Sequence, residues 1–90
     1  MDFNWDEAKR KSNLAKHGLD FAGAYQIFDL PIFVVPDDRE DYGETRYQGI
    51  GYLNGDFVVV VFTEPDETTI RIMSLRKAAL KERSIYEREI

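Results

Sequence analysis

The chain has 90 residues, 43% hydrophobic and 32% charged side chains and a formal net charge of −5. This length allows one folded domain over residues 1–90, and the apolar content excludes a disordered tail. The chain has no cysteine and one histidine, which excludes a thiolate nucleophile and a multi-histidine zinc site, so we expect no metal or other cofactor.

The first residues lack the basic and apolar regions of a signal peptide, and no stretch approaches the ~20 apolar residues of a membrane span. We therefore expect a soluble, cytoplasmic protein without a membrane partner.

The first two predicted elements are helices. Asn4, followed three residues later by a glutamate, is typical of a capping box, so a helix is expected from there to His17, closed by Gly18. Asp20 is predicted to cap a second helix over 21–28, whose apolar stripe is Phe21, Ala24, Tyr25 and Phe28.

From residue 32 the pattern changes to that of strands. Residues 32–35 form a short apolar run whose following proline suits the edge of a sheet. An acidic loop is expected over 37–43. Residues 45–53 alternate, with Arg46, Gln48, Ile50 and Tyr52 on one face, and Asn54-Gly55 is a strong hairpin signal.

Two more strands and a helix complete the predicted fold. Residues 57–62 are apolar on both faces, which is typical of a central strand; any part that the helices leave uncovered is expected to form a docking surface. A turn at 64–67 leads to a strand over 68–75 and a last helix over 77–90. The expected fold class is α+β, with two N-terminal helices, a four-stranded antiparallel meander and a C-terminal helix.

The charge is unevenly distributed along the chain. Residues 1–18 carry a net charge of +1, residues 19–70 a net −9 and residues 71–90 a net +3. An acidic protein is ordinarily a poor partner for nucleic acid, because phosphate binding depends on Lys and Arg. If the two basic ends pack side by side, however, they form a locally positive surface, since charges beyond ~8–10 Å are screened. The alternative is that the charges are simply spread for solubility.

Several side chains are candidates for chemistry. His17 belongs to the residue type that most often transfers protons near neutral pH, although a histidine at a helix C-terminus also has a favourable dipole contact. Arg46 lies in the middle of a strand, where it faces either solvent or a ligand. Arg71 and Arg76 have opposite parity, so a regular strand would point them to opposite faces, and at most one would share the face of Arg46.

Cations without a thiol or a metal cluster suit metal-independent RNA cleavage. In that reaction the ribose 2′-OH is the nucleophile, so the protein has to orient the RNA, move a proton and stabilise the phosphorane charge. Guanidinium groups bind phosphate oxygens in a bidentate manner.

Short segments spread over roughly residues 3–87 form one ordered set: 3–9 (FNWDEAK), 16–18 (KHG), 44–46 (ETR), 71–78 (RIMSLRKA), Glu82-Arg83 and Tyr86. This set resembles one family, the BrnT-type toxins of BrnT/BrnA toxin–antitoxin modules. It implies a RelE-like fold, ribonuclease activity and neutralisation by a cognate BrnA-like antitoxin with a ribbon-helix-helix part. It also implies binding to operator DNA, through the antitoxin complex. Relatives carry Thr or Ser at the position of Ala79, where it starts the last helix.

The sequence therefore predicts a toxin endoribonuclease that cleaves RNA without a metal, arrests translation and is monomeric when isolated. The residues predicted to be catalytic are His17, Arg46 and Arg76. Those predicted to bind substrate or give secondary support are Lys16, Arg71, Arg83 and Tyr86. The competing hypothesis is a non-catalytic module of the same fold that binds a partner or acts as an operator corepressor.

Overall fold

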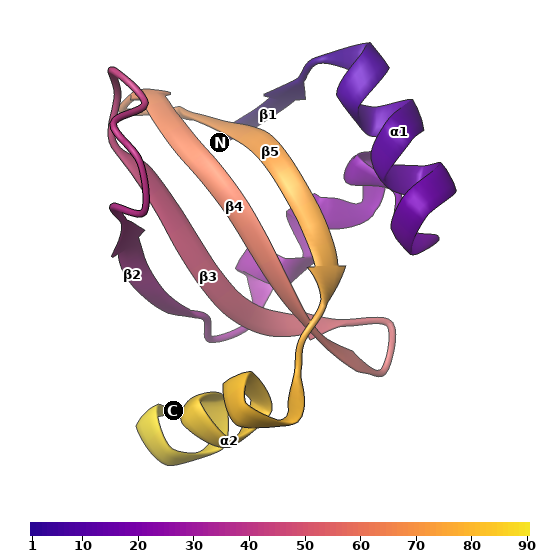
Figure 1. Cartoon of the computed structure of the whole chain (residues 1–90), viewed down its shortest axis with the longest axis vertical. Helices are drawn as coiled ribbons and strands as arrows, with labels where there is room; N and C mark the ends of the chain where they lie inside the picture. The colour runs from indigo at the N-terminus through magenta and orange to yellow at the C-terminus, as the bar shows by residue number, and fades with distance from the viewer.

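The computed structural model describes residues 1–90 and contains a five-stranded mixed sheet with three helices (Figure 1). The elements in chain order are β1 (Asp2–Trp5), α1 (Glu7–His17), the 3₁₀ helix η1 (Phe21–Asp29), β2 (Phe33–Asp37), β3 (Arg46–Leu53), β4 (Asp56–Asp66), β5 (Thr69–Lys77) and α2 (Leu80–Glu89). The strand order is β1-β5-β4-β3-β2, with β1 parallel to β5 and the other pairs antiparallel. No helix has the length and apolar character needed to cross a membrane.

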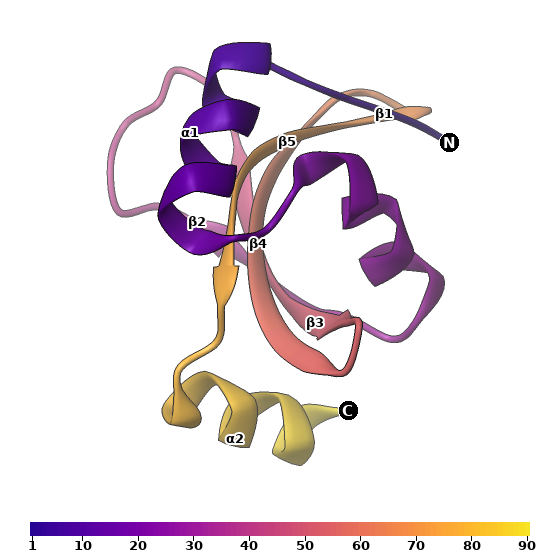
Figure 2. The same ribbon diagram turned by 90° about the vertical axis from the view of Figure 1, so that its right-hand side faces the viewer.

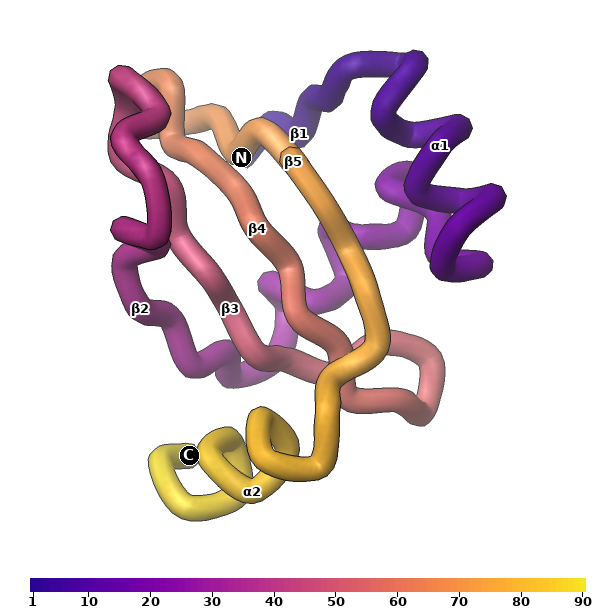
Figure 3. The backbone as a smooth tube through the Cα atoms, in the orientation of Figure 1, coloured from indigo at the N-terminus to yellow at the C-terminus, as the bar shows by residue number.

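The predicted four-stranded antiparallel meander is wrong, because a strand precedes the first helix. β1 lies along β5 although the two are far apart in sequence (Figure 3), and Asn4 of β1 pairs with Arg71 of β5. Residues 2–5 alternate polar and apolar, which is the period of a strand, but four residues are too few to reveal it. The helix N-cap is consequently Asp6 and not Asn4, and its side chain accepts a hydrogen bond from the Lys9 amide at 3.0 Å.

The second helix is where it was predicted but is of a tighter type. Asp20 caps it as expected, by accepting a hydrogen bond from the Ala22 amide. A 3₁₀ helix has three residues per turn, so its buried residues recur every third position: Phe21, Ala24 and Ile27. Tyr25, which an α-helical period would bury, is 50% exposed.

The face of the sheet that η1 covers holds the hydrophobic core (Figure 2). Valine, isoleucine, leucine and phenylalanine side chains of β4 and β5 alternate onto this face: Val58, Val60, Phe62, Ile70, Ile72 and Leu75. At Gly51 the helix comes so close to β3 that an added Cβ would lie 2.6 Å from the Ile27 side chain. Glycine is therefore required there for packing.

Several predicted boundaries are confirmed, and others shift. Gly18 ends α1 with a φ of 71°, and the turn at Asn54-Gly55 has φ values of 50° and 87°. β2 is an edge strand, as its proline indicates. β4 is longer than predicted and runs through the expected turn to Asp66, whereas α2 begins only after Ala79.

Candidate functional site

The face of the sheet opposite η1 carries polar side chains in a line that crosses all five strands. The register pairs Asp37 with Arg46, Thr63 with Arg71, and Arg71 with Asn4. Extending the β3–β4 ladder by one residue places Arg46 beside Thr63. Directly opposed residues point to the same side of a sheet, so these five side chains form one row. We call it the polar row, and its face the open face.

A β-bulge in β5 places two arginines on the open face. The ladder with β4 skips Met73, between its pairs at Ile72 and Ser74. The extra residue reverses the alternation, so Arg71 and Arg76 both lie on the face of Arg46. The expectation that at most one of them would share this face is therefore wrong, because it assumed a regular strand.

Arg46 is the charged member of the polar row with the fewest polar partners. Its Cζ lies 3.9 Å from the centroid of the Tyr42 ring. Its Nε is buried without a hydrogen-bond partner, since the Glu44 carboxylate lies 3.7 Å away. The guanidinium is thus held in place by stacking and retains its capacity to bind an anion.

Asp37, next to Arg46 in the row, is neutralised by a different arginine. Arg39 donates from Nε and Nη2 to the two carboxylate oxygens of Asp37 at 2.7 and 2.9 Å. The Asp37 side chain is 1% exposed, and its contact with Arg39 holds the pKa of the carboxyl below its ordinary value. The acidic segment predicted as a loop over 37–43 therefore begins with a buried strand residue.

Arg76 lies on the same face nearer to α2, and its guanidinium is occupied. It donates from Nη1 and Nη2 to the carboxylate oxygens of Glu82 at 2.8 and 2.7 Å. Glu82 also accepts a hydrogen bond from the Ala79 amide at 2.8 Å. The paired charges raise the pKa of Arg76 and lower the pKa of Glu82. This pair joins the end of β5 to the start of α2.

A shallow hollow of about 280 Å³ lies where the end of α1 meets β5. Lys16 and His17, the two predicted site residues at the end of α1, both line it. The full lining is Lys9, Ser12, Asn13, Lys16, His17, Met73 and Ser74. His17 is partly buried and Lys16 is exposed. Because Ser74 belongs to the open face, the hollow adjoins that face between Arg71 and Arg76.

Asn13 holds α1 against β5. β1 pairs with β5 only as far as Ile72, which leaves the next part of this sheet edge without a strand partner. The side-chain amide of Asn13 replaces that partner. Its Oδ1 accepts a hydrogen bond from the backbone N–H of Leu75 at 3.1 Å, and its Nδ2 donates to the Leu75 carbonyl at 2.8 Å. Lys16 and His17, one turn further on, are positioned by this contact.

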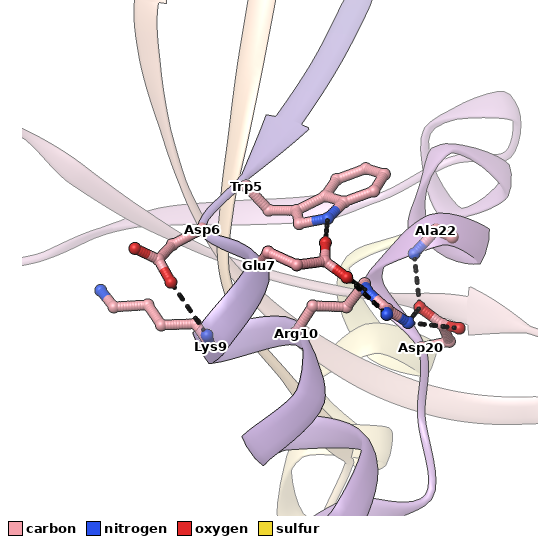
Figure 4. A network of polar contacts seen from close by, with 7 residues as sticks. All are labelled: Trp5, Asp6, Glu7, Lys9, Arg10, Asp20 and Ala22. Carbon is pink, nitrogen blue, oxygen red and sulfur yellow. Dashed lines mark hydrogen bonds and ion pairs between the residues drawn. The ribbon is translucent and has the colours of Figure 1, made fainter.

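A second polar network fixes the other end of α1 (Figure 4). Glu7 accepts hydrogen bonds from Trp5 Nε1 at 3.1 Å and from Arg10 Nε at 2.7 Å, and the bond from Arg10 lowers the pKa of Glu7. Arg10 also contacts Asp20, the cap of η1, at 3.3 Å. Together with Asn13, this network fixes α1 relative to β1, η1 and β5.

Comparisons with known proteins agree with the resemblance in sequence. Residues 5–82 match the family model described as ribonuclease toxin, BrnT, of type II toxin–antitoxin systems. The structure is similar to a 1.1 Å crystal structure of the Brucella abortus ribonuclease toxin BrnT, with a TM-score of 0.73 and 36% sequence identity. The match covers 88% of this chain and 97% of that one. The chain belongs to the BrnT family. No curated protein matches it in sequence.

Membership of the BrnT family, whose description names a type II toxin–antitoxin system, implies an antitoxin partner. The sequence predicts a docking surface for it on any uncovered part of β4. Val59 and Val61 are only 1% and 7% exposed, however, so this prediction is wrong. In the register, Arg76 and Ser74 of β5 flank them on one side. The open face is therefore lined by polar and charged groups above buried valines.

Arg83 and Tyr86, the α2 residues predicted to contact substrate in this BrnT-family chain, lie away from the polar row. The Arg83 guanidinium lies 4.8 Å from the centroid of the Phe57 ring and pairs with Glu87 at 3.2 Å. The Tyr86 ring also packs on Phe57, and its hydroxyl donates to the Pro31 carbonyl at 2.8 Å. These contacts anchor α2 across one end of the sheet.

Sequence reasoning missed four residues of the open face: Arg39, Thr63, Ser74 and Glu82. Ser74 and Glu82 lie inside segments that resemble the BrnT family, so that resemblance could have drawn attention to them. Nothing local distinguishes Arg39 from other loop residues or Thr63 from other strand residues. Their relevance depends on pairing between strands that are distant in sequence.

Proposed function

We propose that this BrnT-family chain cleaves RNA through the ribose 2′-OH without a metal ion. The observation that supports the proposal is the composition of the open face. Arg46, Arg71 and Arg76 project from it, and the hollow with Lys16 and His17 adjoins it. Within the structure, no three His, Asp or Glu side chains gather as metal ligands.

In the proposed reaction the 2′-oxygen attacks the adjacent phosphorus and the bond to the 5′-oxygen breaks. The products are a 2′,3′-cyclic phosphate and a free 5′-OH. His17 transfers a proton at one of the two reacting oxygens, and Arg46 and Arg76 stabilise the charge that develops on the phosphorane. Lys16 holds a neighbouring phosphate, and Arg71 supports Arg46 in binding the substrate.

Arg83 and Tyr86 give secondary support from α2. For Tyr86 this support consists of holding the helix, since its hydroxyl already donates to the Pro31 carbonyl.

We further propose that cleavage takes place in the cytoplasm and arrests translation, and that a BrnA-like ribbon-helix-helix antitoxin relieves it. The complex is expected to bury more than ~1,200 Å² in total, as stable interfaces do. The isolated chain is expected to be a monomer, with dimerisation and operator binding supplied by the antitoxin. Light scattering on the isolated chain tests this part, which a stable homodimer would contradict.

The central experiment incubates the purified chain with end-labelled RNA in excess EDTA, beside DNA of the same sequence. We expect RNA fragments ending in a 2′,3′-cyclic phosphate and intact DNA, because DNA lacks the nucleophile. Intact RNA, or cleavage that EDTA abolishes, would contradict the proposal. His17→Ala protein purified in the same way controls for contaminating nucleases.

The second candidate function is a non-catalytic partner-binding module. The Arg76–Glu82 pair favours it, because an arginine that already binds a carboxylate through both nitrogens has less capacity for phosphate. Expression of the chain without an antitoxin separates the two functions. A ribonuclease arrests growth and degrades RNA, whereas a binding module does neither.

A further inference from the structure

Two buried side-chain polar atoms of the structure lack hydrogen-bond partners, and they belong to neighbouring residues of the polar row. They are Nε of Arg46 and Oγ1 of Thr63. Thr63 is 3% exposed, and its strand β4 runs next to the strand of Arg46. Both side chains project to the open face from neighbouring positions.

The hydroxyl of Thr63 has no structural task that would account for it. A buried hydroxyl without a partner lowers stability, and valine would fit the strand with nearly the same shape. The two preceding positions of β4 on this face are in fact Val59 and Val61. A polar group at the next position on this face therefore calls for a partner outside the chain.

Charged groups flank the hydroxyl on both sides. Arg46 on β3 and Arg71 on β5 are its neighbours across the sheet, and adjacent strands are ~4.8 Å apart. Arg71 uses one nitrogen to donate to Asn4 at 3.1 Å, and the Nε of Arg46 has no hydrogen-bond partner. Two guanidinium groups and a hydroxyl, all of them donors, thus come from adjacent positions of the polar row.

We propose that Arg46, Thr63 and Arg71 form a phosphate subsite that binds the RNA backbone, with Thr63 as the residue that completes it. The proposal rests on the proposed function for the identity of the ligand. Arg76 lies further along the open face, because its partner Val59 is four residues along β4 from Thr63, a rise of ~13 Å. The cations of this face therefore extend over more than the length of one phosphate, so the substrate is an RNA segment that spans several phosphates.

The carboxylates near this subsite do not prevent a phosphate from binding there. The Asp37 carboxylate is bound by Arg39 through both oxygens. Glu44 is half-exposed and lies 3.7 Å from Arg46 Nε, so a phosphate has to displace only this long contact. The hydroxyl lies beneath its neighbours, so Arg46, which is held by stacking on Tyr42 and not by a hydrogen bond from Nε, has to shift before a phosphate can reach it.

The test measures binding of a 2′-O-methyl RNA hexamer, which cannot be cleaved, and of inorganic phosphate, together with thermal melting. Thr63→Val is expected to melt at or above the wild-type temperature and to bind RNA about tenfold more weakly, since a hydrogen bond to an anion is lost. Thr63→Ser keeps the hydroxyl and retains binding. Thr45→Val, at an exposed threonine beside the row, is the matched control, and Glu44→Gln is expected to bind more tightly.

Equal RNA affinity of Thr63→Val and wild type would overturn the proposal, as would a Thr63→Val protein that melts well below wild type, because the hydroxyl would then have a structural partner. The readout does not depend on catalysis. A wild-type chain that leaves ordinary RNA intact would refute the proposed function, whereas loss of binding in Thr63→Val would still support the subsite.

Discussion

Arg46 and Arg76 occupy the same face of one sheet, yet their surroundings differ. Arg76 donates two hydrogen bonds to Glu82, at 2.8 and 2.7 Å. Arg46 makes none, and its closest ion pair, with Glu44, is 3.7 Å long. The difference arises because α2 begins beside Arg76 and supplies a carboxylate at hydrogen-bond distance, whereas the loop over Arg46 supplies mainly an aromatic ring.

This contrast shows how much the neighbours of an arginine determine its role. At Arg76 the guanidinium stabilises the junction of β5 and α2, and a phosphate that binds it has to compete with a carboxylate. At Arg46 the buried, unpaired nitrogen contributes little to stability. A phosphate can bind this guanidinium without first breaking a hydrogen bond to a carboxylate. We therefore expect Arg46 to matter chiefly for activity and Arg76 for both activity and stability.

Arg46→Ala tests the activity side of the contrast and has the largest expected effect. RNA cleavage is expected to fall about 10²–10³-fold, the usual loss when one donor to a charged transition state is removed. The free energy of unfolding is expected to change by less than about 1 kcal/mol, because no hydrogen bond is lost. Single-turnover cleavage and urea denaturation measure the two quantities. Wild-type activity in this variant would mean that Arg46 does not stabilise the transition-state charge and would leave Arg76 as the candidate for that role.

His17→Ala shows whether the chemistry lies in the hollow between the two arginines. If His17 transfers a proton, cleavage is expected to fall about 10²-fold or more and to lose its pH dependence near neutrality. The pH profile of single-turnover cleavage measures this. A variant that melts early but cleaves normally per folded molecule would instead indicate a dipole contact at the end of α1. Lys11→Ala, at an exposed lysine of α1 that does not line the hollow, is the control.

Arg76→Ala tests the stability side. The sequence predicts Arg76 to be catalytic, so loss of activity is expected, and the structure adds a cost in stability, because Glu82 is left partly buried without its partner. We expect a destabilisation of about 1–3 kcal/mol. Glu82→Gln keeps an acceptor for the Ala79 amide and is expected to cost about 1 kcal/mol. Urea denaturation of both single variants and the double variant yields the coupling energy of the pair.

The contribution of this pair also depends on pH in a defined direction. The pKa of Glu82 is lowered in the folded protein from an ordinary value of 4.5. Its contribution is therefore complete above that ordinary pKa and is lost as the pH falls through the lower, folded value. The stability difference between wild type and Glu82→Gln is expected at pH 7 and should disappear in acid. A difference that persists in strong acid would mean that the charge of Glu82 is not responsible.

Ala79→Thr has the smallest expected effect and is expected to stabilise the start of α2, next to the Arg76–Glu82 pair. Ala79 is the N-cap of α2 and has no side-chain acceptor, so only Glu82 contributes to the capping box. A threonine hydroxyl at this position is expected to stabilise the protein by ~0.5–2 kcal/mol. The urea midpoint measures it, with Ala78→Thr as the neighbouring control. An unchanged midpoint would show that the free amides of α2 are already satisfied by water.

The sequence alone predicted the features that depend on neighbouring residues. Gly18 as a helix end, Asp20 as a cap and Asn54-Gly55 as a turn are local choices of backbone geometry, and all three are confirmed. The alternation of β3 correctly placed Arg46 on one face together with Gln48. The resemblance to the BrnT family also came from the sequence, because it depends on ordered short motifs.

Tertiary structure decided the features that depend on pairing between distant segments. β1 is a strand because β5 offers an edge to it, and four residues could not signal this beforehand. The bulge at Met73 brings Arg71 and Arg76 to one face, since the ladder with β4 sets the register of β5. Thr63 gains its place between two arginines in the same way. Hydrogen-bond register is a property of two strands together, so neither strand's sequence specifies it by itself.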